Sequence, residues 1–370
     1  MLPTPQLPNT SLPHAVSFSI AEQQRQKTPI LPIFLPFQGC PQRCLYCAQN
    51  RQTGRSGGNL HAIYTELQKR LEQTAAAGQH LELGFFGGTF TGLPLEWMDH
   101  FLHLAKMFKS RGTVTRVRCS TRPDFVKPPL LERIANAGLD LIELGIQSFD
   151  EQVLTTSRRG YSADTAHKAC LRVMRYGFAL GIQLLPGLPG HTPRLWQNDA
   201  AHVLHLAPEC LRIYPCLVLA RTPLAKLWRQ GGYTPWSLRQ TVRTLAPSLT
   251  AFDQAQIALI RMGLPPEPEL VDTILAGPWH PALGELVRSR AALRAVISHS
   301  QLLGPGPKTL FVPRTHMSQV VGHKKGNLPL LQKVGLPRHR ILPWGRNELH
   351  LARVGHSASF GPDTITPDPF

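Results

Sequence analysis

The sequence has no run of about eighteen consecutive apolar residues, so no segment reaches the length of a membrane-spanning helix and we expect no membrane association. Residues 1–28 also lack the continuous apolar segment of a secretory signal peptide. They are rich in Pro, Gln and Ser and indicate a flexible lead-in over residues 1–29. Without a secretion signal we expect a cytoplasmic protein, whose seven cysteines stay reduced and available for metal binding instead of forming disulfides.

Acidic residues are scarce, with 23 Asp or Glu against 40 Lys or Arg in 370 residues and a formal net charge of +17. Residues 280–350 alone contain 11 Lys or Arg and 2 acids, a net of +9, which is over half of the excess. Such a balance favours a polyanionic partner, and RNA fits better than a membrane surface because no basic amphipathic helix with a bulky apolar face is evident. A generally basic, solvated surface is the alternative.

Three of the seven cysteines form a close group, whereas the other four are scattered over later segments. Cys40, Cys44 and Cys47 have the spacing C-x3-C-x2-C, which can hold three irons of a 4Fe–4S cube. No fourth cysteine lies near, so one iron would stay open to a small molecule. A structural zinc site usually needs four ligands in two paired knuckles, and no second knuckle is evident. A cluster is therefore favoured over zinc and over reduced core cysteines.

From residue 33 to about residue 230, short apolar runs typical of strands alternate with helical patterns. The expected strands are 33–39, 81–88, 115–122, 139–148, 178–187 and 210–219. The expected helices are 61–77, 95–110, 129–137, 163–176, 193–206 and 223–230. Nearly continuous apolar runs such as 141–146 are typical of parallel strands covered on both faces. Six consecutive β/α units predict an α/β fold, a partial (β/α)6 barrel with right-handed crossovers.

A hydrophobic content of 42% indicates a globular chain with an ample core. We expect it to contain a larger domain and a smaller basic appendage. We expect the barrel over residues 30–250 and a basic C-terminal region with RNA-binding capacity over residues 251–355. Within the second region, residues 234–260 have a helical pattern and residues 262–281 are broken by prolines. Residues 356–370 are expected to form a disordered tail.

Functional residues of such barrels gather at the C-terminal ends of the strands, and unusual residues occur at the ends expected here. The three cysteines follow the first strand, and the candidate ligand-binding residues at or beside the ends of the first four strands are Tyr46, Gly87, Gly88, Thr89, Ser120, Arg122, Gln147 and Ser148. The glycines would let a ligand's amino acid moiety approach the backbone closely, and the Thr89 hydroxyl would add a polar contact. A plain tight turn is the alternative for the two glycines.

The polar candidates each have an ordinary structural alternative. Arg122, which would point into the same cavity as Ser120, can grip a carboxylate bidentately or instead pair with Asp124. Gln147 and Ser148 suit hydrogen bonds to a ribose or an adenine, whereas Ser148 can also serve in a turn or as a helix cap. Tyr46 can pack on a bound ligand or belong to the core.

Two lysines of the basic region lie between glycines. Lys324 and Lys325 occur between Gly322 and Gly326, and such a loop can clamp RNA phosphates as the GXXG loop of KH modules does. The spacing here is one residue longer than in that motif, and a solvated turn is the alternative.

Taken together, the motifs resemble the radical S-adenosylmethionine (SAM) superfamily and, more narrowly, the radical domain of the catalytic subunit of Elongator and its short bacterial relatives. The likeness extends over about residues 33–269 and rests on five stretches: Cys40-x3-Cys44-x2-Cys47; Phe86-Gly-Gly-Thr-Phe90 with Leu93-Pro94; Thr121-Arg-Pro-Asp124; Glu143-Leu-Gly-Ile-Gln-Ser148 followed by Arg159-Gly160; and Arg212-Ile-Tyr-Pro-Cys-Leu-Val218 with Thr222-Pro-Leu. The resemblance implies a 4Fe–4S cluster on the three cysteines and SAM on the open iron. It also implies reductive cleavage of SAM to a 5′-deoxyadenosyl radical, with an external reductant such as flavodoxin or ferredoxin.

The chain departs from the Elongator subunit at three points. The first gap of the cysteine motif is shorter, Ser120 replaces a glutamate, and we recognise no acetyltransferase domain after the barrel. We therefore expect an enzyme that acts on a tRNA base but does not complete carboxymethylation of the wobble uridine alone. One alternative is a small-molecule radical enzyme resembling the oxygen-independent coproporphyrinogen oxidases, whose substrate is also anionic. The other is a cluster-bearing RNA-binding protein without turnover.

Overall fold

The computed structural model describes residues 12–20, 28–41, 44–49 and 59–355, and the chain divides into two units. The larger unit comprises residues 23–283, and the smaller unit combines residues 1–22 with residues 284–370. The sequence placed this division at residue 250. In the structure the division lies at residue 283, because residues 258–262 still contribute a strand to the sheet of the larger unit. The expected tail over residues 356–370 lies outside the described residues.

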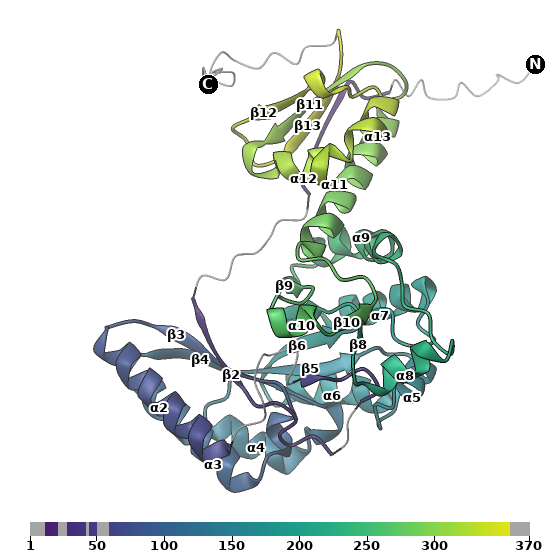
Figure 1. Cartoon of the computed structure of the whole chain (residues 1–370). Coiled ribbons are helices and arrows are strands. Elements are labelled where there is room, and N and C mark those ends of the chain that lie inside the picture. The colour runs from purple at the N-terminus through teal and green to yellow at the C-terminus, as the bar shows by residue number, and fades with distance from the viewer. Residues whose placement is uncertain (1–11, 21–27, 42–43, 50–58, 356–370) are drawn as a thin grey trace, which may run out of the picture. The chain divides into compact units, whose positions relative to one another are not determined.

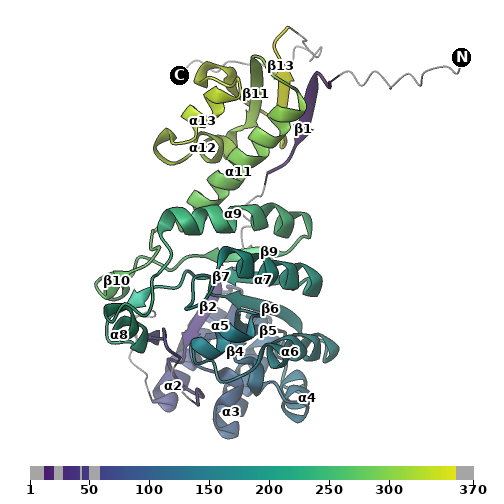
Figure 2. The same cartoon turned by 90° about the vertical axis from the view of Figure 1, so that its right-hand side faces the viewer.

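The larger unit is built on a seven-stranded sheet in which every neighbouring pair is parallel. Its strands, in spatial order, are β2 (Ile30–Phe34), β3 (Leu81–Phe86), β4 (Val114–Thr121), β5 (Leu141–Gln147), β6 (Ala179–Leu184), β7 (Cys210–Ile213) and β9 (Ala258–Met262). The sheet is curled, with helices along its outer face (Figures 1 and 2). The predicted α/β fold with a partial barrel is confirmed.

The helices of this unit alternate with the strands along the chain. They are α2 (Leu60–Ala76), α3 (Leu95–Ser110), α4 (Pro128–Asn136), α5 (Glu151–Thr156), α6 (Ala163–Arg175), α7 (Pro193–Leu206), α8 (Pro223–Arg229), α9 (Leu238–Gln254) and α10 (Pro268–Val271). Several begin at a side-chain cap: Ser162 accepts a hydrogen bond from the amide of Thr165, and Thr192 precedes a proline in the first turn of α7. All seven residues of β5 are buried, as expected for a strand covered on both faces.

The sheet contains one strand more than the six that the sequence predicted. The helical pattern expected over residues 234–260 ends at Gln254, and Gln256 has a left-handed backbone (φ 56°) that stops the helix. The next residues form β9 beside β7. The pattern hid this strand because β9 is short, only partly buried and interrupted by Arg261.

The loop that carries the cysteines is fixed at the C-terminal rim of the sheet. The amide of Leu35 donates to the carbonyl of Phe86 (2.7 Å), and the amide of Thr89 donates to the carbonyl of Gln38 (2.7 Å). A Cβ atom at Gly88 would overlap the carbonyl oxygen of Gln38, so a glycine is required for this close approach. The cysteine loop and the end of β3 therefore hold each other in place.

The smaller unit has a four-stranded sheet in the order β1 (Ala15–Phe18), β13 (Leu349–Arg353), β11 (Lys308–Pro313), β12 (Ile341–Trp344). The β11–β12 pair is parallel, and the other two pairs are antiparallel. Its helices are α11 (Leu283–Leu302), α12 (Met317–Val321) and α13 (Leu328–Lys333). Their apolar side chains share one core with the sheet, including Val296, Leu310, Leu331 and Leu351.

The expected flexible lead-in over residues 1–29 is corrected at residues 15–18, which form a strand of this sheet, whereas residues 1–11 and 21–27 lie outside the described residues. Residues 15–18 pair with β13, with Val16 opposite Leu351 and Phe18 opposite Leu349. Phe18 also stacks on His299, with ring centroids 3.9 Å apart. A strand of four residues is too short to stand out in a segment rich in Pro and Gln.

A short antiparallel pair, β8 (Val218–Leu219) with β10 (Ile274–Ala276), completes the strands of the larger unit. None of the helices in the described part of the chain combines the length and the apolar character that crossing a membrane requires.

Candidate active site

A cavity of about 430 Å³ lies at the C-terminal ends of the parallel strands in the larger unit. All three cysteines of the C-x3-C-x2-C motif line it. The other predicted residues along its wall are Tyr46, Gly87, Gly88, Ser120, Arg122 and Gln147. The rim of the barrel therefore brings together residues that are far apart in the sequence, as the β/α pattern predicted.

The three thiols lie in different surroundings within this wall. Cys40 Sγ is 3.2 Å from the hydroxyl of Thr89, and Cys44 Sγ accepts a hydrogen bond from Arg159 (3.0 Å). Burial raises the pKa of the Cys40 thiol. Burial, together with the neighbouring Cys44 and Cys40, raises the pKa of Cys47 to about 12. Ionising the thiols of Cys40 and Cys47 in isolation is therefore unfavourable, and a bound metal, which deprotonates its thiol ligands outright, would reverse that preference.

The donor set fits an iron–sulfur cluster. Among the described residues, no three His, Cys, Asp or Glu side chains converge on one point as the ligands of a single ion do. A cube does not need such convergence, because each cysteine binds a different iron. The three cysteines share one cavity, and Arg122 and Arg159 beside them supply positive charge against the thiolates.

Arg159 links the cysteine loop to the end of β5. This arginine is 5% exposed and donates to the carbonyl of Gly145 (2.6 Å) and to the hydroxyls of Tyr161 (2.8 Å) and Tyr46 (3.1 Å), besides the sulfur of Cys44. The sequence motifs included Arg159 only within a stretch of family likeness and assigned it no role. Its distance in sequence from the cysteines concealed this contact.

Arg122 pairs with Asp124, which is one of the two partners that the sequence indicated for it. Its guanidinium forms two hydrogen bonds to Asp124, at 2.9 and 2.8 Å, and donates a third to the carbonyl of Arg159 (2.6 Å). It nevertheless lines the cavity, so the ion pair orients this side chain along the wall.

Two predicted ligand residues do not line the cavity. Thr89 is 1% exposed, and its hydroxyl contacts the sulfur of Cys40. Thr89 therefore stabilises the cysteine loop instead of facing the cavity. Ser148 is fully buried, and its hydroxyl donates to Asp199 (3.1 Å). The amide of Asp150 donates to the Ser148 hydroxyl (3.1 Å), which matches the turn alternative for Ser148, whereas the cap of α5 is Asp150. A contact of Ser148 with an adenine or a ribose stays a prediction. Gln147, the preceding residue, has a left-handed backbone (φ 71°) and does line the cavity.

A buried network of charges lies behind the cavity wall. The Glu143 carboxylate, 1% exposed, is bound by Arg118 (2.8 Å) and by Arg212 (2.6 Å). Burial would raise the pKa of Glu143, but the two guanidinium groups hold it below its usual value. The amide of Gln183 donates to both Glu143 (3.0 Å) and Ser120 (2.9 Å). Arg212 and Gln183 line the cavity as well. The sequence motifs included Arg212 only within a stretch of family likeness, without a role, and did not include Gln183.

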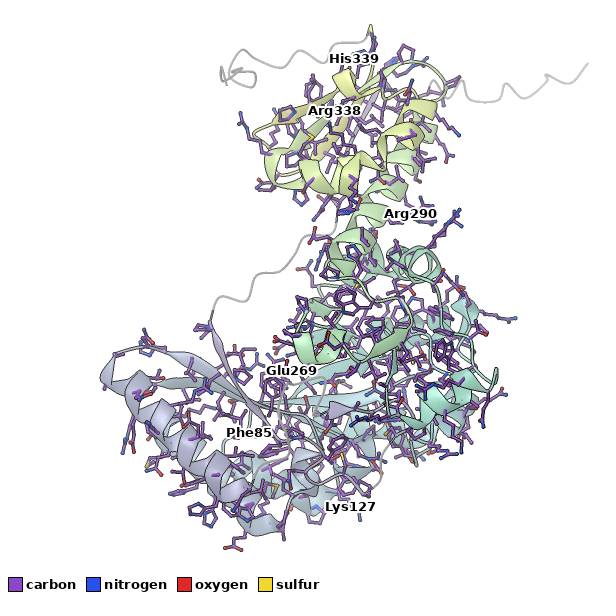
Figure 3. All side chains as sticks on the ribbon, in the orientation of Figure 1. Phe85, Lys127, Glu269, Arg290, Arg338 and His339 are labelled. Carbon is purple, nitrogen blue, oxygen red and sulfur yellow. The ribbon has the colours of Figure 1, made fainter. Side chains whose placement is uncertain are left out.

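The two lysines of the predicted RNA loop belong to the smaller unit. Lys324 and Lys325 are exposed in a short 3₁₀ turn (His323–Lys325) between α12 and α13. Both have left-handed backbones, with φ of 51° and 62°. The loop lies between two short helices, and its role as a phosphate clamp stays a prediction. Arg338 and His339 are also exposed on this unit (Figure 3).

Known proteins resemble this chain over most of its length. The tRNA uridine(34) acetyltransferase of Methanocaldococcus jannaschii is 22% identical over 85% of this chain and 62% of its own length. Elongator complex protein 3 of Mus musculus is 24% identical over 55% of this chain and 44% of its own length. The chain spans about half the length of such curated relatives.

A solved structure has the same fold. The archaeal Methanocaldococcus infernus Elp3 with an N-terminal deletion superposes with a TM-score of 0.53 and 18% sequence identity, covering 74% of this chain and 64% of that chain. Two family matches account for most of the sequence. Residues 34–201 match the Radical SAM superfamily, and residues 208–293 match the Radical SAM C-terminal domain. The chain belongs to the radical SAM superfamily, a superfamily of enzymes.

Proposed function

We propose that this protein binds a 4Fe–4S cluster through Cys40, Cys44 and Cys47, cleaves SAM and acts on a base of tRNA. The observation that carries the proposal is the cavity at the barrel rim, which all three cysteines line. When bound, the cluster supplies the electron that splits SAM into methionine and a 5′-deoxyadenosyl radical. An external reductant such as flavodoxin or ferredoxin provides that electron, and the cytoplasm is the compartment that fits this chemistry.

The surrounding residues bind and orient SAM in this proposal. Gly87 and Gly88 leave the backbone at the end of β3 open to its amino acid end. Gln147 offers an amide for the ribose or the adenine, and Tyr46 forms a wall beside the cysteines. Arg122, already oriented by Asp124, contributes positive charge towards a carboxylate.

A tRNA substrate is supported by two independent observations. The relatives include proteins named tRNA uridine(34) acetyltransferase, which makes uridine 34 the leading target. The chain carries a net charge of +17, and such an excess favours a polyanionic partner.

The proposal predicts that SAM cleavage is coupled to tRNA. Protein reconstituted anaerobically and reduced with dithionite is expected to release 5′-deoxyadenosine, and tRNA should increase that release several-fold because the substrate positions a hydrogen atom for abstraction. Chromatography of the nucleoside products measures both reactions. Mass spectrometry of tRNA nucleosides from cells with and without the gene identifies the product. Cluster-loaded protein that releases no 5′-deoxyadenosine, with or without tRNA, would contradict the proposal.

The basic loop is proposed to contact RNA phosphates. Replacing Lys324 and Lys325 with alanine should weaken tRNA binding and reduce the slope of log affinity against log salt by about one to two units, because each lost phosphate contact removes roughly 0.7 to 0.9. Binding measured at several salt concentrations tests this expectation. The control replaces Lys69 and Lys168, two exposed lysines on the helices α2 and α6, and should leave the slope unchanged. An unchanged slope in the loop variant would identify a solvated turn.

A further inference from the structure

Two arginines lie directly side by side on neighbouring strands of the cavity wall. Arg212 on β7 is the register partner of Arg261 on β9, and both side chains line the cavity. The register shifts at this point: Leu211 pairs with Leu259, and the next pair is Arg212 with Arg261. A bulge of this kind changes which side chains share a face. It directs Arg261 to the same side of the sheet as Arg212.

This juxtaposition is unfavourable in the protein by itself. Like charges directly opposite on adjacent strands destabilise a sheet. Arg212 is compensated by Glu143, whose carboxylate lies 2.6 Å from Arg212 Nε and raises its pKa despite the opposing effect of burial. Arg261 is exposed and donates through Nε to the carbonyl of Gly263 (3.4 Å), and the ion pairs among the described residues do not include it. Arg261 thus lines the cavity with a positive charge that no carboxylate of the described residues pairs with.

The walls of the cavity that contains the pair are mainly apolar. Arg212 lies over the ring of Phe86, 5.1 Å from its centroid, which fixes the plane of the guanidinium. Phe34, Leu217 and Leu264 line the same cavity. No aspartate or glutamate occurs among the described residues that line it. The cavity therefore combines two guanidinium groups with apolar surface on which the face of a flat ring can pack.

We propose that Arg212 and Arg261 bind a phosphate group of the substrate ribonucleotide while the apolar wall beside them receives its base. The assignment rests on the proposed function and adds the group that holds the target nucleotide in the cavity. A guanidinium presents two parallel N–H donors that match the oxygens of a phosphate, and such charge-assisted contacts are among the strongest hydrogen bonds. Arg212, held by Glu143 and Phe86, is the fixed half of the pair, and Arg261 is the adaptable half.

A single neutralised phosphate tests the assignment. The probe is a tRNA anticodon stem-loop RNA in which the phosphate on the 5′ side of uridine 34 is either native or replaced by an uncharged methylphosphonate. Cluster-loaded wild-type enzyme is expected to bind the native RNA about tenfold more tightly, the size of one charged hydrogen bond. In Arg261→Gln that preference should fall to a few-fold, because Arg212 alone still contacts the phosphate, and Arg261→Lys should keep more of it.

The control is Arg243→Gln, which removes the same charge from the exposed face of α9 and should retain the tenfold preference. Equal binding of both RNAs by the wild-type enzyme would overturn the assignment, as would full discrimination in Arg261→Gln. If the wild-type enzyme binds neither RNA and tRNA does not increase release of 5′-deoxyadenosine, the proposed function itself fails and the assignment falls with it. Measured iron content and thermal midpoints of all variants establish that each is folded and loaded.

Discussion

Replacing Cys40, Cys44 and Cys47 together with alanine is expected to reduce the iron content of the reconstituted protein from about four atoms per chain to nearly none. Each cysteine binds one iron of the proposed cube, and no other side chain of the described cavity wall is a thiol. Release of 5′-deoxyadenosine should fall to background with the iron. Iron analysis and the absorbance of the thiolate-to-iron band measure the first effect, and chromatography measures the second.

The matched control is Cys170→Ala. Cys170 is a fully buried cysteine of α6 and does not line the cavity, so its loss should leave iron content and cleavage unchanged. Single substitutions in the motif should each lower the iron content, since a cube held by two cysteines is weakly retained. A triple variant that keeps an intact cluster would show that these cysteines are not its ligands.

Removing the carboxylate of Glu143 is expected to lower the stability of the larger unit strongly. Glu143→Ala leaves the buried guanidinium groups of Arg118 and Arg212 without their shared partner. Breaking a buried ion pair in this way typically costs about 3–5 kcal/mol. For a unit of this size the thermal midpoint should fall by roughly 10 °C, a value that calorimetry or circular dichroism measures.

The comparison for Glu143 is Glu209→Ala. Glu209 pairs with Arg116 at 2.5 Å, but its side chain is 47% exposed, and ion pairs of this kind contribute at most about 1 kcal/mol. A midpoint that falls no further in Glu143→Ala than in Glu209→Ala would mean that the network is not needed for folding. Its role would then lie in orienting Arg212.

The parts of the fold that the sequence predicted are those with strong local patterns. Strands buried on both faces, such as Leu141–Gln147, have unbroken apolar runs, and the cysteine spacing is a property of neighbouring residues. The rule that function lies at the C-terminal ends of strands then brought the cysteines, the glycines and Arg122 to one rim.

The parts that the sequence missed depend on pairing between distant segments. β9 has a weak pattern of its own and exists because β7 offers it an edge. The hydroxyl of Ser148 donates to the buried Asp199, a contact that the local sequence did not indicate because the two residues are not neighbours in the chain. Arg261 has no recognisable motif, and only the bulge beside Arg212 reveals where its charge is directed. Tertiary contacts of this kind decide side-chain roles that local periodicity leaves undetermined.

The strand β1 has a consequence for the order in which the chain can fold. Its partner β13 is synthesised only after the whole barrel. The edge of the smaller sheet therefore cannot close before β13 is made, whereas the barrel strands pair mainly with their sequence neighbours and can assemble as they emerge. On the ribosome the barrel should thus form first, and Ala15–Phe18 must remain unpaired until β13 arrives to complete the sheet of the smaller unit.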